Sequence, residues 1–232
     1  MLRFITAGES HGQCLIAVLE GMVSGLSVSA SEIDRQLERR QRGYGRGGRM
    51  TIEKDRVEIL SGVRFGQTIG APISLEIKNK DFKIDRLPEV KKPRPGHADL
   101  VGALKYDRRD ARDILERSSA RETAARVAVG AVCMAFLENF GVEIFSHVVC
   151  LGGVEARTNN LSFENIRRAA ASSPVACADP SAAKKMMARI DRTKAARDTL
   201  GGVFELLIRG LPPGLGSYSQ YDRRLSAQLG AA

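Results

Sequence analysis

Short apolar runs and longer amphipathic segments follow one another along the chain and predict a protein with both strands and helices. Runs typical of strands occupy residues 2–6, 14–20, 57–61, 72–77, 142–150 and 201–208. Patterns typical of helices occupy residues 30–40, 120–140, 163–171 and 180–197. Because strands and helices do not alternate regularly, we expect an α+β fold of stacked layers rather than a series of βαβ units.

Local signals mark where two of these helices begin. Ser29 with Glu32, and Ser119 with Glu122, have the spacing of a capping box, in which a hydroxyl and a carboxyl satisfy free N–H groups of the first turn. The helix after Ser119 is apolar on nearly every face over residues 127–137. A helix without a polar face is normally buried, so we expect this one at the centre of the fold.

The charge balance indicates an anionic partner. The 232 residues contain 36 Lys and Arg against 27 Asp and Glu, a formal net charge of +9. This excess favours nucleic acid, an acidic membrane surface, or a phosphorylated or carboxylated small molecule. No apolar run of about 20 residues is present for crossing a membrane, and the first residues lack the apolar core of a secretory signal. Four scattered cysteines without a C-x-x-C motif are typical of reduced thiols, and these features predict a cytoplasmic protein without a membrane partner.

Residues 35–49 form a glycine- and arginine-rich segment with six Arg and one Glu. Its backbone can approach an anion closely, and its guanidinium groups match phosphate and carboxylate oxygens. Gly43, Gly45 and Gly48 spell G-x-G-x-x-G, but they follow a predicted helix and precede a strand, the reverse of the order in dinucleotide-binding folds. Three interpretations stay open from the residues alone: small-anion binding, a nucleic-acid segment in which Tyr44 stacks on a base, and a solvated basic loop.

Three histidines are present, and their settings differ. His97 stands between Arg94 and Asp99 in a loop that two prolines stiffen, which suits positioned proton transfer, although a loop histidine is also an ordinary surface residue. His11 occupies a polar turn, G-E-S-H-G, between two apolar runs and is a candidate general acid. His147 lies inside an apolar run, and we interpret it as structural.

The segment 116–123 stands at the head of the long apolar helix and contains two serines and two arginines. A helix start of this composition favours binding of a phosphate or carboxylate, and ordinary capping by Ser119 is the alternative. We expect no metal site, because no group of acidic, His or Cys residues has metal-binding spacing.

Six segments, in this order, closely resemble those of the chorismate synthase family. They are GESHGQCLIAVLEG at 8–21, RRQRGYGRGGRM at 39–50, RPGHAD at 94–99, ERSSARETAARVAVGA at 116–131, DTLGGVFE at 198–205 and LPPGLG at 211–216. Several motifs of this length in one order are far more specific than any single motif, and the resemblance extends over essentially the whole chain.

The resemblance implies a single domain over residues 1–232, with helices sandwiched between antiparallel sheets. It also implies a homotetrameric enzyme that converts 5-enolpyruvylshikimate 3-phosphate to chorismate and phosphate by an anti-1,4-elimination. The family requires reduced FMN without net redox change, and some members reduce their own flavin with NADPH. The substrate carries one phosphate and two carboxylates, which an arginine-lined pocket would bind.

Residue by residue, the resemblance implies specific roles. His11 is similar to the family histidine that assists the leaving phosphate, and His97 to the one that protonates or steadies the reduced flavin. The residues implied to line the substrate pocket are Ser10, Arg40, Arg46, Arg49, Arg94 and Arg121. Those implied to contact FMN are Arg117, Ser118 and Ser119. Arg40 and Arg46 also match positions associated with NADP.

The family's chains normally continue well past the length seen here. We therefore expect an N-terminal fragment or truncated product, with its site residues intact, an incomplete FMN site and a core open on one side. An open core would favour aggregation or instability. A catalytically inactive fragment and a basic nucleic-acid-binding module are the alternatives; Tyr44 is the only aromatic residue in the basic loop, which counts against nucleic acid.

Overall fold

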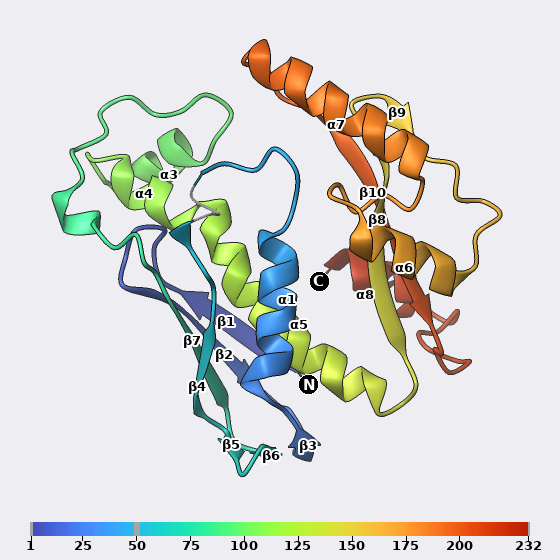
Figure 1. Cartoon of the computed structure of the whole chain (residues 1–232). Coiled ribbons are helices and arrows are strands. Elements are labelled where there is room, and N and C mark those ends of the chain that lie inside the picture. The colour runs from blue at the N-terminus through green and yellow to red at the C-terminus, as the bar shows by residue number, and fades with distance from the viewer. Residues whose placement is uncertain (1, 49–51, 232) are drawn as a thin grey trace. The chain divides into compact units, whose positions relative to one another are not determined.

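The computed structural model describes residues 2–48 and 52–231 (Figure 1). The chain divides into two compact units, residues 1–135 and residues 136–232. Compactness alone does not separate one domain from two, so the single domain over residues 1–232 stays a prediction. None of the helices in the described part of the chain is long and apolar enough to cross a membrane. All four cysteines are free thiols.

A four-stranded antiparallel sheet forms the main layer of the first unit (Figure 1). In spatial order its strands are β1 (Arg3–Ala7), β2 (Cys14–Glu20), β7 (Ile73–Lys78) and β4 (Val57–Ser61). Alternate residues of β2 and β7 are buried, and they face one another in register, as in the pairs Leu15–Ile77 and Leu19–Ile73. Each such side chain stabilises the fold by about 1.5–3 kcal/mol. The short apolar runs predicted these strands correctly.

Helix α1 (Ala30–Gln41) begins at the predicted cap. The Ser29 hydroxyl accepts a hydrogen bond from the Glu32 N–H at 3.3 Å. Ile33 and Leu37, four residues apart on one face, are fully buried. The cap and the apolar stripe therefore act together to place this helix against the core.

Helix α5 (Thr123–Glu138) begins three residues later than its pattern predicts. Residues Ala120–Glu122 form a 3-10 turn instead, and the Ser119 hydroxyl accepts from the N–H of Arg121 at 3.3 Å. Gly141, with φ of +71°, follows the helix end as expected of a glycine stop. Small buried residues fill the first half of the helix: Ala124, Ala125, Ala128, Val129, Ala131 and Val132. The prediction of a buried helix is confirmed for that half.

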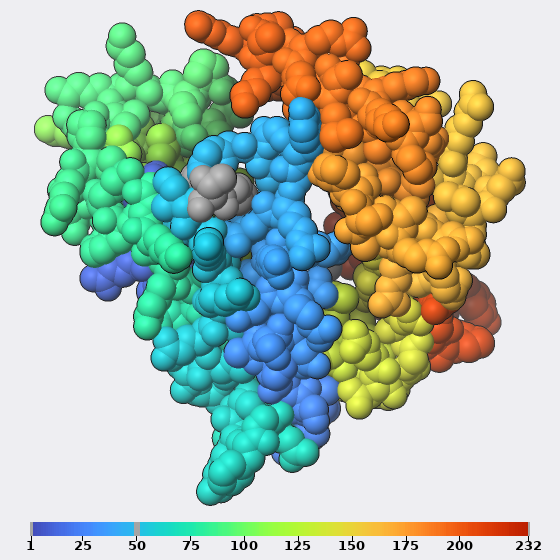
Figure 2. All heavy atoms as spheres, in the orientation of Figure 1, coloured from blue at the N-terminus to red at the C-terminus, as the bar shows by residue number. Residues whose placement is uncertain are grey.

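Three short strands form a second sheet of the first unit that the pattern did not predict. In spatial order they are β3 (Ser24–Ser27), β6 (Gln67–Ile69) and β5 (Val63–Arg64). Figure 2 shows the β5–β6 hairpin projecting from the surface. At its turn Phe65 and Gly66 both have positive φ, and the Phe65 side chain is 90% exposed. Strands of two to four residues are too short for an alternating pattern to stand out.

Three short helical segments among the described residues of the first unit also went unpredicted. They are η1 (Ile84–Arg86), α3 (Asp99–Lys105) and α4 (Arg112–Arg117). Helices α3 and α4 pack closely at Gly102, where an added Cβ would clash with the side chain of Ile114. Each has at most two turns, so tertiary packing rather than a repeated apolar stripe holds it.

The second unit contains a three-stranded antiparallel sheet with two longer helices. Its elements are β8 (Glu143–Leu151), β9 (Val154–Glu155), α6 (Phe163–Ser172), α7 (Pro180–Ala195), β10 (Gly202–Arg209), η3 (Tyr221–Arg223) and α8 (Leu225–Ala231), with strand order β10–β8–β9. Ile166 and Ala170 of α6 pack with Phe145 and Leu207 from the sheet. The helices and antiparallel sheets of both units confirm the predicted α+β class.

His147 is packed as a structural histidine would be. Its side chain is buried in β8, and its Nε2 lies 2.9 Å from Glu205 Oε2 on β10. Its ring stacks on that of Phe145. The interaction joins neighbouring strands of one sheet and lies in a different unit from the other two histidines.

Strand β10 leaves apolar side chains uncovered at the edge of its sheet. Phe204 is 70% exposed, and Val203 and Leu206 are also exposed. Exposed apolar edge strands favour association between molecules. We expect Phe204→Lys to lower self-association, measured by light scattering across a concentration series. Tyr218→Lys, which removes an exposed ring outside any strand, is the control, and equal behaviour of the two variants would contradict the role of the edge.

Candidate active site

The turn between β1 and β2 presents Ser10 and His11. Gly8 has φ of +101°, and a Cβ there would clash with the backbone of Cys14 on the returning strand. Only glycine therefore fits this tight reversal. The turn is anchored from outside by Asn79, whose Nδ2 donates to the carbonyl of Gly12 at 2.8 Å.

Glu116 of α4 holds both residues of this turn. Its carbonyl accepts from the N–H of Ser10 at 2.9 Å, and its Oε2 accepts from the N–H of His11 at 2.8 Å. The same Oε2 lies 2.9 Å from His11 Nδ1. On its other side, Glu116 Oε1 accepts from Arg112 Nη1 at 3.2 Å. The remaining ring nitrogen, His11 Nε2, is 3.5 Å from Asp81 Oδ2.

His97 shares a second buried carboxylate with Arg94. Asp99 at the start of α3 is fully buried and accepts from Arg94 Nε and Nη2, both at 2.8 Å. His97 Nδ1 lies 3.1 Å from Asp99 Oδ1 and 3.0 Å from Arg94 Nη2. The Arg94 hydrogen bonds hold the pKa of Asp99 well below its usual range.

This depressed pKa predicts an acid-dependent contribution to stability. The ionised Asp99 stabilises the fold above the ordinary aspartate pKa of about 4, and the contribution is lost as pH falls below it. We expect the gap in unfolding free energy between the parent chain and Asp99→Asn to be largest above about pH 5 and to shrink toward about pH 3. Urea unfolding at several pH values measures this gap. Asp113→Asn, at an exposed ion pair, is the control; a pH-independent gap for Asp99→Asn would contradict the prediction.

The charges at the two histidine sites act on one another through Glu116 and Arg94. The pKa of Arg94 is raised mainly by its hydrogen bond to Asp99, and the charge of Glu116 adds to the effect. Glu116, which holds His11, is therefore within electrostatic range of Arg94, which contacts His97. We call these five residues the histidine cluster: His11, Arg94, His97, Asp99 and Glu116.

Arg121 is the centre of a buried ionic network. Its Nη1 donates to both oxygens of Asp55, at 2.6 and 2.8 Å, and its Nε donates to Asn79 Oδ1 at 2.9 Å. Its Nη2 lies 3.8 Å from Glu53 Oε2. Asn79 also anchors the His11 turn, so Arg121 supports that turn through its hydrogen bond to Asn79. These contacts do not test its predicted contact with substrate.

Arg40 reaches the same network from the end of α1. Its Nη1 is 3.6 Å from Asp55 Oδ2, while Nη2 donates to the carbonyl of Ala120 at 2.9 Å and Nε to Thr123 Oγ1 at 3.0 Å. Burial lowers the pKa of Arg40, and the nearby charge of Arg121 lowers it further against the opposing effect of Asp55. Arg40 Nη1 and Arg121 Nη2 are buried donors that have no hydrogen-bond acceptor among the described residues.

The rest of the basic loop is only partly described. Arg46 is exposed, and its charge contributes to the lowered pKa of Arg40, so the two guanidinium groups are near each other. A Cβ at Gly43 would clash with the Arg46 side chain, which therefore folds back over this glycine. Arg49, the other predicted arginine of the loop, lies outside the described residues.

The predicted FMN segment lies at the junction of α4 and α5. Arg117 donates from Nη1 to the Gly8 carbonyl at 3.1 Å and from Nη2 to the Thr6 carbonyl at 2.9 Å. The Ser119 hydroxyl caps the following turn, as the capping alternative predicted. Within the described part of the chain, the Ser118 hydroxyl makes one long contact, at 3.5 Å, with the Leu115 carbonyl, and the Ser118 N–H donates to the Ile114 carbonyl at 2.9 Å.

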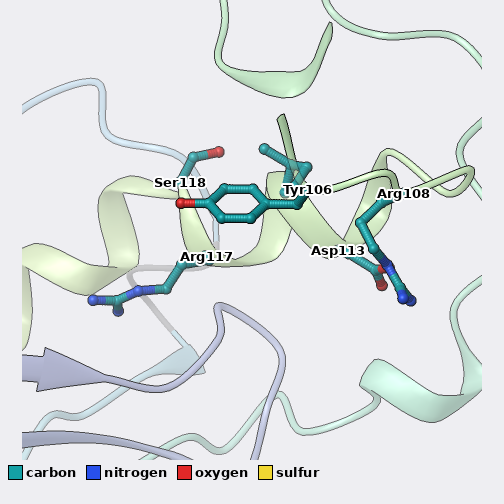
Figure 3. A pocket seen from close by; sticks show the side chains of 6 residues that line it. Tyr106, Arg108, Asp113, Arg117 and Ser118 are labelled. Carbon is teal, nitrogen blue, oxygen red and sulfur yellow. The ribbon is translucent and has the colours of Figure 1, made fainter. Parts of the chain in front are cut away.

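A hollow of about 480 Å³ lies beside this segment. Its lining residues are Tyr106, Arg108, Asp113, Ile114, Arg117 and Ser118. Figure 3 shows the Tyr106 ring across the middle of the hollow, with Arg117 and Ser118 toward one end and Arg108 and Asp113 toward the other. An aromatic ring, an apolar side chain and a cationic end in one cavity are suited to a planar ligand with an anionic group.

Sequence reasoning missed the acidic and amide partners of the basic residues. Glu53, Asp55, Asn79 and Asp81 were not singled out, and Glu116 was noted only as part of a motif. Their signal was weak, because a carboxylate beside a basic motif is usually a solvated surface residue. Burial in the tertiary structure is what distinguishes them.

The chain has close similarity to known proteins. A family profile described as chorismate synthase matches residues 2–232. The chain is 54% identical to the chorismate synthase of Pelobacter propionicus and 51% identical to that of Enterococcus faecalis, with all of this chain and 62% and 63% of those proteins covered. A solved structure titled "Crystal Structure of Chorismate Synthase" has a TM-score of 0.83 at 45% identity, covering 99% of this chain and 64% of that one.

The chain thus spans somewhat less than two thirds of the length of these relatives. Within that span, the agreement in structure confirms the predicted family fold of helices and antiparallel sheets. The motifs, the fold and the two sequence comparisons all lead to one assignment. The chain belongs to the chorismate synthase family.

Proposed function

We propose that this chain carries the substrate and proton-transfer site of a chorismate synthase. The reaction is the anti-1,4-elimination of phosphate from 5-enolpyruvylshikimate 3-phosphate, which yields chorismate. One observation carries the proposal: His11 and His97 each contact a buried carboxylate, and both belong to one cluster with Arg94. Two preorganised imidazoles beside guanidinium groups suit proton management next to an anionic substrate.

The arginines supply recognition of the phosphate and the two carboxylates. Arg94 and Arg46 are exposed enough to meet a ligand directly, and Arg40 lies within electrostatic range of Arg46. Arg121 would act through the field of its buried network and through the turn that carries Ser10. Arg49 completes the proposed set by resemblance alone. Guanidinium groups suit this task because they pair with carboxylate and phosphate oxygens in a bidentate manner.

The two histidines would have different roles in proton transfer. His11 would deliver a proton to the leaving phosphate, and His97 would steady the reduced flavin and the proton associated with it. In both residues Nδ1 faces a buried carboxylate, Glu116 for His11 and Asp99 for His97. These contacts orient each ring, and at His97 the donor Arg94 Nη2 also lies 3.0 Å from Nδ1.

The residues present fit reduced FMN, which would supply transient electron density to the departing group. Arg117 and Ser118 line the hollow beside Tyr106, and Ser119 is next to them in the chain. Among the residues that the structure describes, the Ser118 hydroxyl contacts only the Leu115 carbonyl, at the long distance of 3.5 Å, which leaves it suited to a phosphate oxygen. Arg40 and Arg46 are proposed to contact NADPH when the enzyme reduces its own flavin. A homotetramer, as the resemblance implies, and a cytoplasmic location, as the sequence features predict, are part of the same proposal.

An anaerobic assay of the 232-residue chain tests this function. The chain is mixed with 5-enolpyruvylshikimate 3-phosphate and dithionite-reduced FMN, and chorismate absorbance and released phosphate are followed together. We expect equal amounts of both products. Phosphate or chorismate formation no faster than without protein, from a chain shown to be folded by circular dichroism, would contradict activity and support the inactive-fragment alternative. Filter binding of RNA and DNA at two salt concentrations tests the nucleic-acid alternative separately.

A further inference from the structure

We propose that Glu116 is a positioning residue for His11: it keeps Nδ1 protonated and leaves Nε2 as the nitrogen that exchanges the proton. The inference rests on the proposed function, in which His11 serves the leaving phosphate. It assigns a role to a residue that no motif pattern had singled out. The contacts of Glu116 with two consecutive residues of the turn carry it.

Glu116 contacts the turn through three separate bonds. Its backbone carbonyl accepts from Ser10 N–H, and its carboxylate accepts from His11 N–H and contacts His11 Nδ1 at 2.9 and 3.1 Å. The side chain is only 1% exposed, so water does not compete for these bonds. The residues joined are 105 positions apart, which makes the contact a product of the fold and not of a local turn.

The bond to Nδ1 determines the tautomer of the ring. A carboxylate oxygen only accepts, so the nitrogen facing it carries the hydrogen whenever the ring is neutral. When the ring is protonated to the imidazolium, Nε2 carries the second proton, which is the one that exchanges. During elimination the carbon–oxygen bond to the phosphate breaks with its electron pair on oxygen, the proton passes from Nε2 to that phosphate, and a neutral ring with Nδ1–H remains.

The charged groups that face His11 come from two segments. From α4 they are Glu116 and Arg112, whose Nη1 donates to Glu116 Oε1. From the segment after β7 they are Asp81, 3.5 Å from Nε2, and Lys83, which pairs with Asp81 at 2.8 Å. The Nε2 contact with Asp81 is longer than a hydrogen bond, whereas the Nδ1 contact is not. Glu116 therefore orients the ring more strongly than Asp81 does.

The first test reads the tautomer directly in the full 232-residue chain. Histidine labelled with ¹⁵N gives separate Nδ1 and Nε2 chemical shifts by NMR, and His11→Asn identifies which signals belong to His11. At a pH where the ring is neutral, we expect Nδ1 protonated and Nε2 bare. The opposite tautomer in the parent chain would overturn the proposal, and this measurement needs neither a substrate nor a Glu116 variant.

The second test removes the charge of Glu116 and keeps the shape of its side chain. In Glu116→Gln we expect a mixture of both His11 tautomers and a fall in kcat of about 10–100-fold, with little change in KM. Glu116→Asp keeps the charge and should restore part of kcat. Glu58→Gln, at an exposed ion pair with Lys78, is the control and should change neither. An unchanged tautomer in Glu116→Gln would overturn the proposal even if kcat falls.

The two readouts separate this inference from the proposed function. If the parent chain shows the Nδ1–H tautomer but forms no chorismate, the proposed function fails and the positioning of His11 stands. If chorismate forms and the tautomer is reversed, the positioning by Glu116 fails and the function stands.

Discussion

His11→Ala is expected to lower turnover by about 10²–10⁴-fold, because a positioned general acid contributes rate enhancement of that order. The ring is half-buried in the turn between β1 and β2, and the hydrogen bond from the His11 N–H to Glu116 does not require the imidazole, so we expect the surrounding strands to stay intact. Turnover is measured as chorismate formation with reduced FMN. His97→Ala should also lower turnover. The local fold should stay intact in this variant, because Asp99 keeps its hydrogen bonds to Arg94 when His97 is absent.

Two controls make this result specific. Far-ultraviolet circular dichroism and the thermal unfolding midpoint of His11→Ala should match those of the parent chain. Added imidazole should restore part of the lost turnover by occupying the space of the deleted ring. Turnover equal to that of the parent would remove His11 from the mechanism, and a loss accompanied by unfolding would assign it a structural role.

Arg121→Met is expected to lower the free energy of unfolding by about 3–5 kcal/mol. Removing one partner of a buried ion pair leaves the other charge without compensation. Here Asp55 is fully buried and would lose its two shortest hydrogen bonds, while Asn79 would lose the bond to its Oδ1. Urea unfolding monitored by circular dichroism measures the change.

A matched arginine on the same stretch of chain provides the control. Arg126 is 59% exposed and pairs with Glu122 one helical turn away. Exposed pairs of this kind contribute about 0.2–1 kcal/mol, so Arg126→Met should change stability little. Equal effects of the two substitutions would contradict the assignment of Arg121 to a buried network. Turnover of Arg121→Met should also fall, because Asn79 links this network to the turn that carries His11.

The local patterns predicted those parts of the fold that local interactions determine. The alternation of β2 and β7 and the Ser29 cap of α1 involve residues within a few positions of each other, so they are visible in the sequence. Helices α3 and α4 were missed because six or seven residues do not establish a period. Helix α5 begins later than the sequence predicts because the Ser119 hydroxyl caps a 3-10 turn that precedes the helix.

The candidate site divides in the same way. Its basic residues and histidines stood out because arginine, glycine and histidine are concentrated in short motifs with a chemistry of their own. Their carboxylate partners did not stand out. Asp55 is 66 residues from Arg121, and no pattern in the sequence around either residue indicates the other.

The sequence by itself determined the family, the main strands and helices, and which side chains are available for anion and proton chemistry. Only the tertiary structure decided which distant carboxylate holds which base: Glu116 with His11, and Asp55 with Arg121. The physical reason is distance along the chain. Capping and periodicity arise between neighbours, whereas a buried ion pair forms only after distant segments have packed and excluded water from between them.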